Sequence, residues 1–210
     1  MSGADEETAS PASRRVTRER AADLIAVGCS AGGPAALEEV LPQLPARTLT
    51  TVLVAQHMPG RFIALFAERL GRSCALPVRQ PVDGEPLRPG CIYLAPGGRQ
   101  TWIEKGSGSI QFRVRSRDAT ERHAPSIDLL MVSVAQAFGR RALGVVMTGM
   151  GSDGVQGLRA IRERGGRTIA ESEETASVFG MPREVIRAGL ADQVLPRGEI
   201  ARRLASLCRR

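Results

Sequence analysis

Three residues that can form a nucleophilic site each follow an apolar segment of this sequence. They are Ser30, His57 and Asp153. When such residues meet, the imidazole takes the hydroxyl proton and the carboxylate orients and charges the imidazole, which turns a weak hydroxyl into a nucleophile. The sequence therefore predicts acyl-transfer chemistry if the fold brings the three side chains together.

Ser30 lies in the pentapeptide Gly28-Cys29-Ser30-Ala31-Gly32, which matches G-x-S-x-G. In a strand-to-helix elbow the flanking glycines allow a tight turn and leave the serine oxygen exposed, beside free N–H groups at the helix start. The pentapeptide alone also fits a serine that caps the following helix. A phosphate-binding loop is a further alternative, although neither G-x-G-x-x-G nor G-x-x-x-x-G-K-[ST] occurs here.

The chain has two histidines, His57 and His123. His57 follows a buried segment, whereas His123 lies in the charged loop RDATERHAP, so position favours His57 as the base. The spacing of the two histidines does not indicate a metal site. Asp153 lies in the glycine-rich stretch TGMGSDGVQG at a strand-to-helix junction, where an aspartate often caps the helix instead.

Alternating apolar segments and helical patterns predict an α/β fold built on a parallel sheet. A doubly wound, mostly parallel, Rossmann-like sheet with an antiparallel hairpin extension is expected. Strands are predicted at 24–27, 51–56, 142–149, 167–172 and 192–196, helices at 34–44, 61–70, 126–138, from 155 to about 164 and after 196, and hairpins between 77 and 116, including CIYLAP. The reactive residues follow the first, second and third of these strands. Because functional groups of open parallel sheets gather at the carboxyl ends of strands, all three can meet at one edge.

Composition excludes several protein classes. The 210 residues suffice for one domain with a sizeable core. No apolar run approaches the roughly 20 residues of a membrane helix, and the start of the chain has no signal-peptide pattern. The four cysteines form no CxxC motif, as expected in a reducing cytoplasm. The net charge of +7 is not arranged as a nucleic-acid stripe, so no nucleic-acid partner is predicted. Residues 1–21 are predicted to be a disordered tail, and 22–210 a single domain.

The order Ser…His…Asp differs from the Ser…Asp…His order of α/β-hydrolases. A resemblance to another family rests on six blocks of the sequence, which are, in order, IAVGCSAGGPAAL, QHMPGRFIALFAERL, HAPSIDLL, GVVMTGMGSDGVQGL, ESEETASVFGMPREVI and AGLADQVLP. Together they resemble the catalytic domain of the chemotaxis protein-glutamate methylesterases, the CheB family, over about residues 22–207.

The resemblance implies a doubly wound α/β domain with the triad at Ser30, His57 and Asp153. It implies hydrolysis of receptor glutamate methyl esters to methanol, and deamidation of receptor glutamines. The substrate would be the cytoplasmic helices of a methyl-accepting chemotaxis receptor, with no metal or organic cofactor and no membrane insertion. Backbone N–H groups near Ser30, His57 or Met150 are candidates for the oxyanion hole. Ala31, Met150 and Gly151 are the residues expected to contact the oxyanion or the substrate.

Two departures from the family pattern stand out. Most members carry an N-terminal receiver domain, for which this chain has no room, so it is expected to be a stand-alone catalytic domain or a fragment. In the block ESEETASVFGMP, Glu171 and Ala176 or Ser177 stand where members often have a glutamine and a cysteine. This second departure leaves the triad intact and affects the expected substrate contacts.

Three other functions remain to be distinguished. One is an esterase of small molecules or of another receptor-like protein. Another is a nucleotide-binding module, which would need an acidic ribose ligand about 20 residues after the glycines, where the sequence has Gln56-His57-Met58. The last is a binding protein without catalysis, which the presence of all three triad residue types argues against.

Overall fold

A computed structural model describes residues 21–106 and 108–208. The predicted tail lies outside these residues, apart from Ala21. The elements are β1 (Leu24–Cys29), α1 (Gly33–Val40), β2 (Thr51–Gln56), α2 (Gly60–Ser73), β3 (Val78–Arg79), β4 (Ile92–Leu94), β5 (Arg99–Lys105), β6 (Ile110–Ser116), α3 (Ile127–Phe138), β7 (Ala142–Val146), α4 (Val155–Glu163), β8 (Arg167–Glu171), α5 (Met181–Arg187), β9 (Gln193–Leu195) and α6 (Arg197–Leu207), with 3-10 turns at Leu41–Gln43 and Gly139–Arg141.

Seven parallel strands form the main sheet in the order β3-β4-β2-β1-β7-β8-β9. The chain builds outward from β1 in one direction through β2 and β4, and then in the other through β7, β8 and β9. The strand order therefore reverses at β1, as in doubly wound folds, and such a switch point opens a crevice at the carboxyl ends of the strands. The predicted α/β fold class is confirmed.

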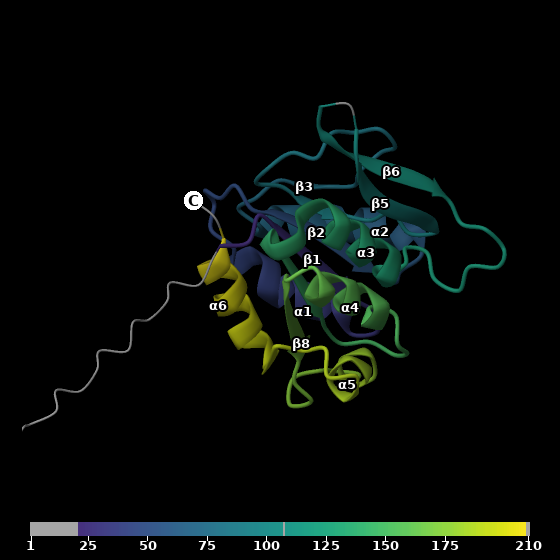
Figure 1. The fold of residues 1–210 in the computed structure, drawn as a ribbon. Helices are drawn as coiled ribbons and strands as arrows, with labels where there is room; N and C mark the ends of the chain where they lie inside the picture. Colours follow the sequence, from purple (N-terminus) through teal and green to yellow (C-terminus); the bar gives the residue numbers. More distant parts are fainter. Residues whose placement is uncertain (1–20, 107, 209–210) are drawn as a thin grey trace, which may run out of the picture.

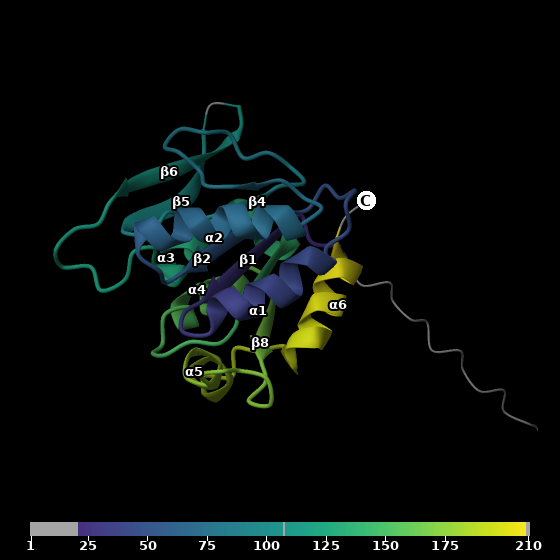
Figure 2. The ribbon, with the colours of Figure 1, turned by 180° about the vertical axis from the view of Figure 1, so that it is seen from behind.

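Helices cover both faces of this sheet, as the two opposite views show (Figures 1 and 2). Side chains alternate along each strand, so Ile25 and Val27 pack into the core under α1, α2 and α6, whereas Leu24 and Ala26 pack under α3, α4 and α5. Burial on both faces explains why β1 and the middle of β2, residues 52–55, are continuous apolar runs without a polar side.

The antiparallel hairpin consists of β5 and β6, which form a separate two-stranded sheet. The hairpin packs beside α3 (Figure 1), where the Ile103 N–H donates to the Ser133 hydroxyl at 3.1 Å. The predicted antiparallel hairpin is confirmed, but it forms a sheet of its own and does not extend the main sheet. The segment CIYLAP forms β4, which pairs in parallel with β2 and not with a hairpin partner. A three-residue strand carries too little local pattern to specify its partner.

Most element predictions are confirmed with shifted ends. The helix predicted over 34–44 ends as an α-helix at Val40 and continues as a 3-10 turn that contains Pro42. The strand predicted over 142–149 ends at Val146, which leaves a longer loop at the switch point. Helix α5 is absent from the sequence prediction, because seven residues between glycines carry little periodicity. No helix within 21–106 and 108–208 has the length and hydrophobicity of a membrane span.

Candidate active site

The ends of β1, β2 and β7 bring the three predicted residues to one edge of the sheet. Cys29 and Gln56 are register partners on β1 and β2, so Ser30 and His57 follow at the same level. The His57 N–H donates to the Cys29 carbonyl at 3.0 Å, which continues the ladder past the strand ends. On the other side, the Ser30 N–H donates to the Thr148 carbonyl at 3.0 Å. Ser30 thus lies between the β2 end and the β7 loop, at the switch point.

Glycines, and not Ser30, supply the tight turn after β1. Gly32 has φ 80°, and among the described residues positive φ occurs only at glycines. Gly32 is also the N-cap of α1, without a side-chain cap, so the alternative that Ser30 caps the helix is wrong. The Ser30 carbonyl accepts from the Gly33 N–H at 2.9 Å and from Gln56 Nε2 at 2.8 Å. The backbone of Ser30 is therefore fixed while its hydroxyl keeps no partner within the described residues.

The β7 loop approaches Ser30 closely at Gly149. A Cβ on Gly149 would lie 2.7 Å from Ser30 Cβ and 2.4 Å from Met181 Sδ, closer than such atoms can approach. The backbone of Gly149 is fixed here because its N–H donates to the Val178 carbonyl at 3.0 Å. Only glycine lets this loop pack against the serine, which accounts for one of the glycines in TGMGSDG.

His57 and Asp153 are hydrogen-bonded across the crevice. His57 Nε2 lies 2.8 Å from Asp153 Oδ2, and the two side chains are 13% and 5% exposed. The Asp153 carboxylate also accepts from the Ile127 and Asp128 N–H groups, each at 2.8 Å, and from the Ser126 hydroxyl at 3.3 Å. Burial raises the pKa of Asp153, but the hydrogen bonds from His57 and the two backbone groups outweigh burial, and the pKa lies below its usual value. Asp153 is therefore an anion at neutral pH.

This pairing determines which nitrogen of His57 can act as a base. An ionised Asp153 can only accept hydrogen bonds, so in the neutral form of the His57 ring Nε2 carries the proton and Nδ1 has the free lone pair. In the chymotrypsin-type triad the roles of the nitrogens are reversed, with Nδ1 on the aspartate. Within the described residues no hydrogen bond joins the Ser30 hydroxyl to His57 in this conformation. Such bonds are commonly long without substrate and tighten when it binds.

Asp153 and Asp128 exchange caps: Asp153 accepts hydrogen bonds at the start of α3, and Asp128 accepts them at the start of α4. Asp153 precedes α4 but accepts from the first N–H groups of α3. Asp128, in the first turn of α3, accepts from the Gly154 and Gly157 N–H groups of the α4 start, at 2.8 and 2.7 Å. Burial raises the pKa of Asp128, and the neighbouring charge of Asp153 adds to this rise. The alternative that Asp153 caps its own helix is wrong, because Gly154 is the α4 N-cap.

The second histidine also belongs to this site. The His123 ring stacks on the His57 ring with centroids 4.4 Å apart and planes 6° from parallel. The hydrogen bond of Asp153 goes to His57, the histidine that position in the sequence favours as the base, and none to His123 is found within the described residues. Sequence reasoning missed the contact of the two rings. The signal was the position of His123 three residues before Ser126, which begins the helix that holds Asp153.

The backbone N–H groups near Ser30, His57 and Met150 differ in whether they already donate within the described residues. Those of Ser30 and His57 are already used in the ladder. Those of Ala31, Met150 and Gly151 donate to no group within the described residues, and the Met150 side chain is 72% exposed. The N–H groups of Ala31, Met150 and Gly151 therefore stay candidates for the oxyanion hole, whereas those of Ser30 and His57 do not.

Cys29, the neighbour of Ser30, is not a competing nucleophile. It is fully buried on the α1 side of the sheet. Burial, and next the charge of Glu171, raise the pKa of its thiol far above the ordinary value. Because the thiolate is the reactive form, this cysteine stays inert.

A buried ion pair supports the Ser30 turn from behind. Glu171, at the end of β8 and 0% exposed, accepts from the Thr148 N–H at 2.8 Å and from Arg197 Nε at 3.0 Å. Thr148 in turn donates its hydroxyl to the Ala31 carbonyl at 2.8 Å. Arg197 also contacts Glu39 of α1 at 3.2 Å. Arg197 thus neutralises the charge of Glu171, the residue that stands where the family often has a glutamine. Through Thr148, this ion pair helps to position the turn that carries Ser30.

Arg197→Ala is expected to lower the free energy of unfolding by about 3–5 kcal/mol, because it leaves Glu171 buried and unpaired. Adding Glu171→Gln in the same chain removes the uncompensated charge and should recover part of this loss. Urea unfolding measures both. Arg202→Ala, on the exposed side of α6 with Glu199 3.8 Å away, is the matched control and should change little. Equal effects of the two single variants would contradict the role given to the ion pair.

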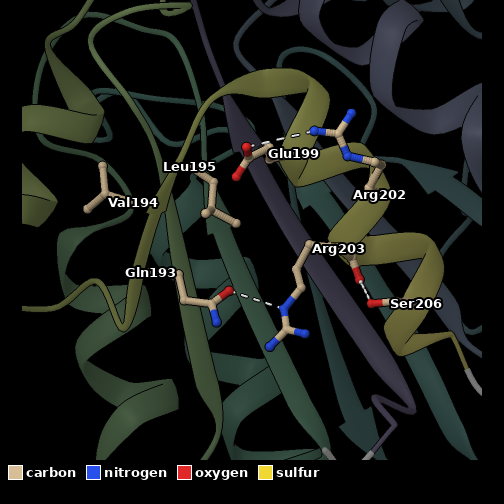
Figure 3. Close-up of a pocket in the computed structure, with 7 residues that line it drawn as sticks. All are labelled: Gln193, Val194, Leu195, Glu199, Arg202, Arg203 and Ser206. Atoms are coloured by element: carbon tan, nitrogen blue, oxygen red, sulfur yellow. Dashed lines mark hydrogen bonds and ion pairs between the residues drawn. The ribbon is translucent and has the colours of Figure 1, made fainter.

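Open hollows flank the site and the far edge of the sheet. A polar cavity of about 390 Å³ lies beside Asp153 and His123, and an apolar one of about 490 Å³ lies beside Met58 and Pro34, under Phe62 and Leu65. A third, of about 710 Å³, lies between β9 and α6, away from the three strand ends (Figure 3). In it Arg202 lies 3.8 Å from Glu199, and Arg203 Nε donates to Gln193 Oε1 at 3.1 Å. Of the residues that the structure describes, no histidine lines this hollow.

Comparison with known proteins agrees with this geometry. A family described as CheB methylesterase matches residues 25–204. The protein-glutamate methylesterase/protein-glutamine glutaminase of Desulfitobacterium hafniense is 48% identical over 189 residues, which cover 90% of this chain and 48% of that protein. The enzyme named protein-glutamate methylesterase/protein-glutamine glutaminase 2 of Nitratidesulfovibrio vulgaris is 45% identical over 179 residues, 85% of this chain and 49% of the relative. The chain therefore spans about half the length of these relatives.

A solved structure is also similar. The crystal structure of the CheB methylesterase catalytic domain of Thermotoga maritima superposes with a TM-score of 0.84 at 35% identity. The match covers 89% of this chain and 98% of the solved chain. The similarity thus extends over a whole catalytic domain.

Proposed function

Because the chain belongs to the CheB methylesterase family, we propose that its site hydrolyses the γ-methyl esters of glutamates in chemotaxis receptors. The observation that carries the proposal is the His57–Asp153 hydrogen bond of 2.8 Å beside Ser30, at the switch point of the sheet. In this proposal residues 22–210 form the catalytic domain. It works without a metal or organic cofactor, in the cytoplasm, in keeping with four free cysteines.

Acylation starts at the Ser30 hydroxyl. Its oxygen attacks the ester carbonyl carbon while its proton moves to Nδ1 of His57, and Asp153 stabilises the resulting imidazolium through Nε2. The carbonyl oxygen becomes an oxyanion, and in this proposal the N–H groups of Ala31, Met150 and Gly151 are the candidates to stabilise it. When the intermediate collapses, His57 returns the proton to the methoxide oxygen. Methanol leaves, and the glutamyl group stays esterified to Ser30.

Deacylation repeats these steps with water. His57 takes a proton from water as it attacks the acyl-enzyme, and then protonates the departing Ser30 oxygen. The products are a free glutamate carboxylate and the resting enzyme. A glutamine side chain can follow the same path with ammonia as the leaving group, so one site supports both the methylesterase and the glutaminase activity.

The surroundings of the site favour a macromolecular substrate. Phe62 and Leu65 of α2 are 47% and 64% exposed beside the apolar hollow, and Met150 of the loop after β7 is also exposed. An open surface of this kind fits the side of a receptor's cytoplasmic helix better than a small ester, which would favour an enclosed pocket. Methanol release from a methylated receptor cytoplasmic fragment, compared with release from a free glutamate methyl ester, tests this. Equal kcat/KM on both substrates would point to a small-molecule esterase.

Salt is expected to slow the reaction on receptor fragments. The chain carries a net charge of +7, and a receptor helix bundle rich in glutamate is acidic, so opposite charges increase the encounter rate. Raising the ionic strength from about 0.01 M to about 0.15 M should lower kcat/KM roughly tenfold, with kcat little changed. The matched control is a neutral ester peptide, whose turnover should not respond. A salt-insensitive rate on the receptor would contradict the steering role of the charge.

A further inference from the structure

The Asp153 bond by itself leaves the His57 ring incompletely fixed. A hydrogen bond at Nε2 fixes the place of that nitrogen, but the χ2 torsion of histidine is broad, and rotation about it moves Nδ1 away from the serine. Effective catalytic groups are held within about 10–20° of their working orientation. A second contact that fixes the plane of the ring is therefore needed for proton transfer from Ser30.

His123 supplies a contact of this type. Its ring lies parallel to that of His57, 6° between planes and 4.4 Å between centroids. Stacked rings resist rotation of either ring away from the parallel arrangement, because rotation would push edge atoms into the neighbour. One face of His57 is thereby covered, while Nε2 is engaged by Asp153 and Nδ1 is left free.

The hairpin holds His123 in place. Gln100 of β5, 1% exposed, donates from Nε2 to the His123 carbonyl at 2.7 Å and accepts from the Ser126 N–H at 3.0 Å. The Gly98 N–H donates to the Ala124 carbonyl at 2.9 Å. The antiparallel hairpin thus fixes both the stacking ring and the start of the helix that binds Asp153.

The charge state of His123 suits this contact. Burial against its neighbour lowers the pKa of His123, and the charge of His57 lowers it further. Arg122 and Arg117, on the same loop, act in the same direction, whereas Asp153 opposes them. A neutral ring can lie on the imidazolium that forms during catalysis without the repulsion of two cations.

We propose that His123 is a positioning residue, whose stacked ring holds the imidazole of His57 in the plane that directs Nδ1 to Ser30. The kinetic part of this inference rests on the proposed function. The placement of the ring does not, because it concerns the free protein alone. In this proposal His123 contributes a flat ring and takes no part in proton transfer. A role as acid or base would instead require its ring nitrogens.

Three substitutions at His123 test the proposal. His123→Phe keeps a flat ring, His123→Leu keeps bulk without flatness, and His123→Ala removes both. The Leu and Ala variants are expected to lower kcat roughly 10–100-fold with KM within about twofold, whereas the Phe variant stays within about threefold of wild type. Thr120→Ala, an exposed residue of the same loop, is the control and should match wild type.

A measurement on the free protein separates the two proposals. The chain has two histidines, so ¹⁵N-labelled ring spectra are simple to assign. The Nε2 proton of His57 should be protected from exchange with water in wild type and His123→Phe, and exchange rapidly in His123→Ala. If no variant releases methanol but this pattern holds, the proposed function fails and the positioning role stands. Equal protection of the His57 Nε2 proton in all variants would overturn the positioning role. So would a kcat of His123→Phe as low as that of His123→Ala.

Discussion

Ser30→Ala is expected to abolish methanol release from a methylated receptor fragment, with kcat reduced roughly 10⁴-fold or more. The reason is that the described crevice offers no other nucleophile at the level of His57. Cys29 is buried on the α1 side of the sheet with a raised pKa, and the Ser30 hydroxyl has no hydrogen-bond partner within residues 21–106 and 108–208. Binding should persist, because the alanine removes one oxygen and leaves the turn held by Thr148. A gas-chromatographic methanol assay together with receptor-fragment pulldown measures both effects.

The control for this variant is Ser206→Ala on α6, the same chemical change at an exposed position beside the hollow of Figure 3. It should retain wild-type turnover. Thermal unfolding of both variants verifies that the loss of activity is not a loss of fold. Ser30→Ala that keeps more than about a tenth of wild-type kcat would contradict the nucleophile assignment, since a triad serine contributes several orders of magnitude.

Asp153→Asn is expected to lower kcat about 10⁴-fold and also to destabilise the fold. Asp153 accepts from His57 and Ile127 through Oδ2, and from Asp128 through Oδ1. An amide offers one oxygen, so its NH₂ group must face a backbone N–H whichever way it is turned. If the NH₂ group faces His57, it also forces the proton onto Nδ1, and the base is lost.

The stability part of this prediction has a defined pH dependence. A carboxyl whose pKa is lowered by folding stabilises the protein above its unfolded value of about 3.9, and this contribution is lost as the pH falls through the lower folded value. The penalty of Asp153→Asn should be about 1–3 kcal/mol at neutral pH and should shrink below about pH 4. Urea unfolding at several pH values measures it. Asp83→Asn, at a more exposed carboxylate that also accepts a backbone N–H, is the control. A penalty that does not change with pH would contradict the ionised state of Asp153.

The sequence predicts the positions of the reactive residues well because strand ends are locally encoded. Buried runs such as Thr51–Gln56 end where a polar residue follows, and parallel pairing then brings these ends to one edge. The order of strands around β1 follows from the doubly wound topology that alternating strands and helices indicate. Local pattern and topology together therefore suffice to place Ser30 and His57 as neighbours.

What the sequence did not predict depends on contacts between distant segments. The exchange of caps between Asp153 and Asp128 requires the starts of α3 and α4 to meet, which no local pattern encodes. The same holds for His123, whose loop reaches His57 only because Gln100 of the hairpin holds it. The ion pair of Glu171 with Arg197 joins residues on different elements, so the charge at position 171 could be noted but not interpreted.

An acyl-enzyme at Ser30 is the central intermediate of the proposed mechanism. Measuring how it partitions between water and hydroxylamine tests it directly. Peptides carrying a glutamate methyl ester and a glutamate ethyl ester are hydrolysed in the presence of hydroxylamine, and the ratio of hydroxamate to glutamate is measured. A common acyl-enzyme predicts the same ratio from both esters, and no product of either kind from Ser30→Ala. A ratio that depends on the leaving alcohol, or hydrolysis that persists without the Ser30 hydroxyl, would show that water attacks the ester directly.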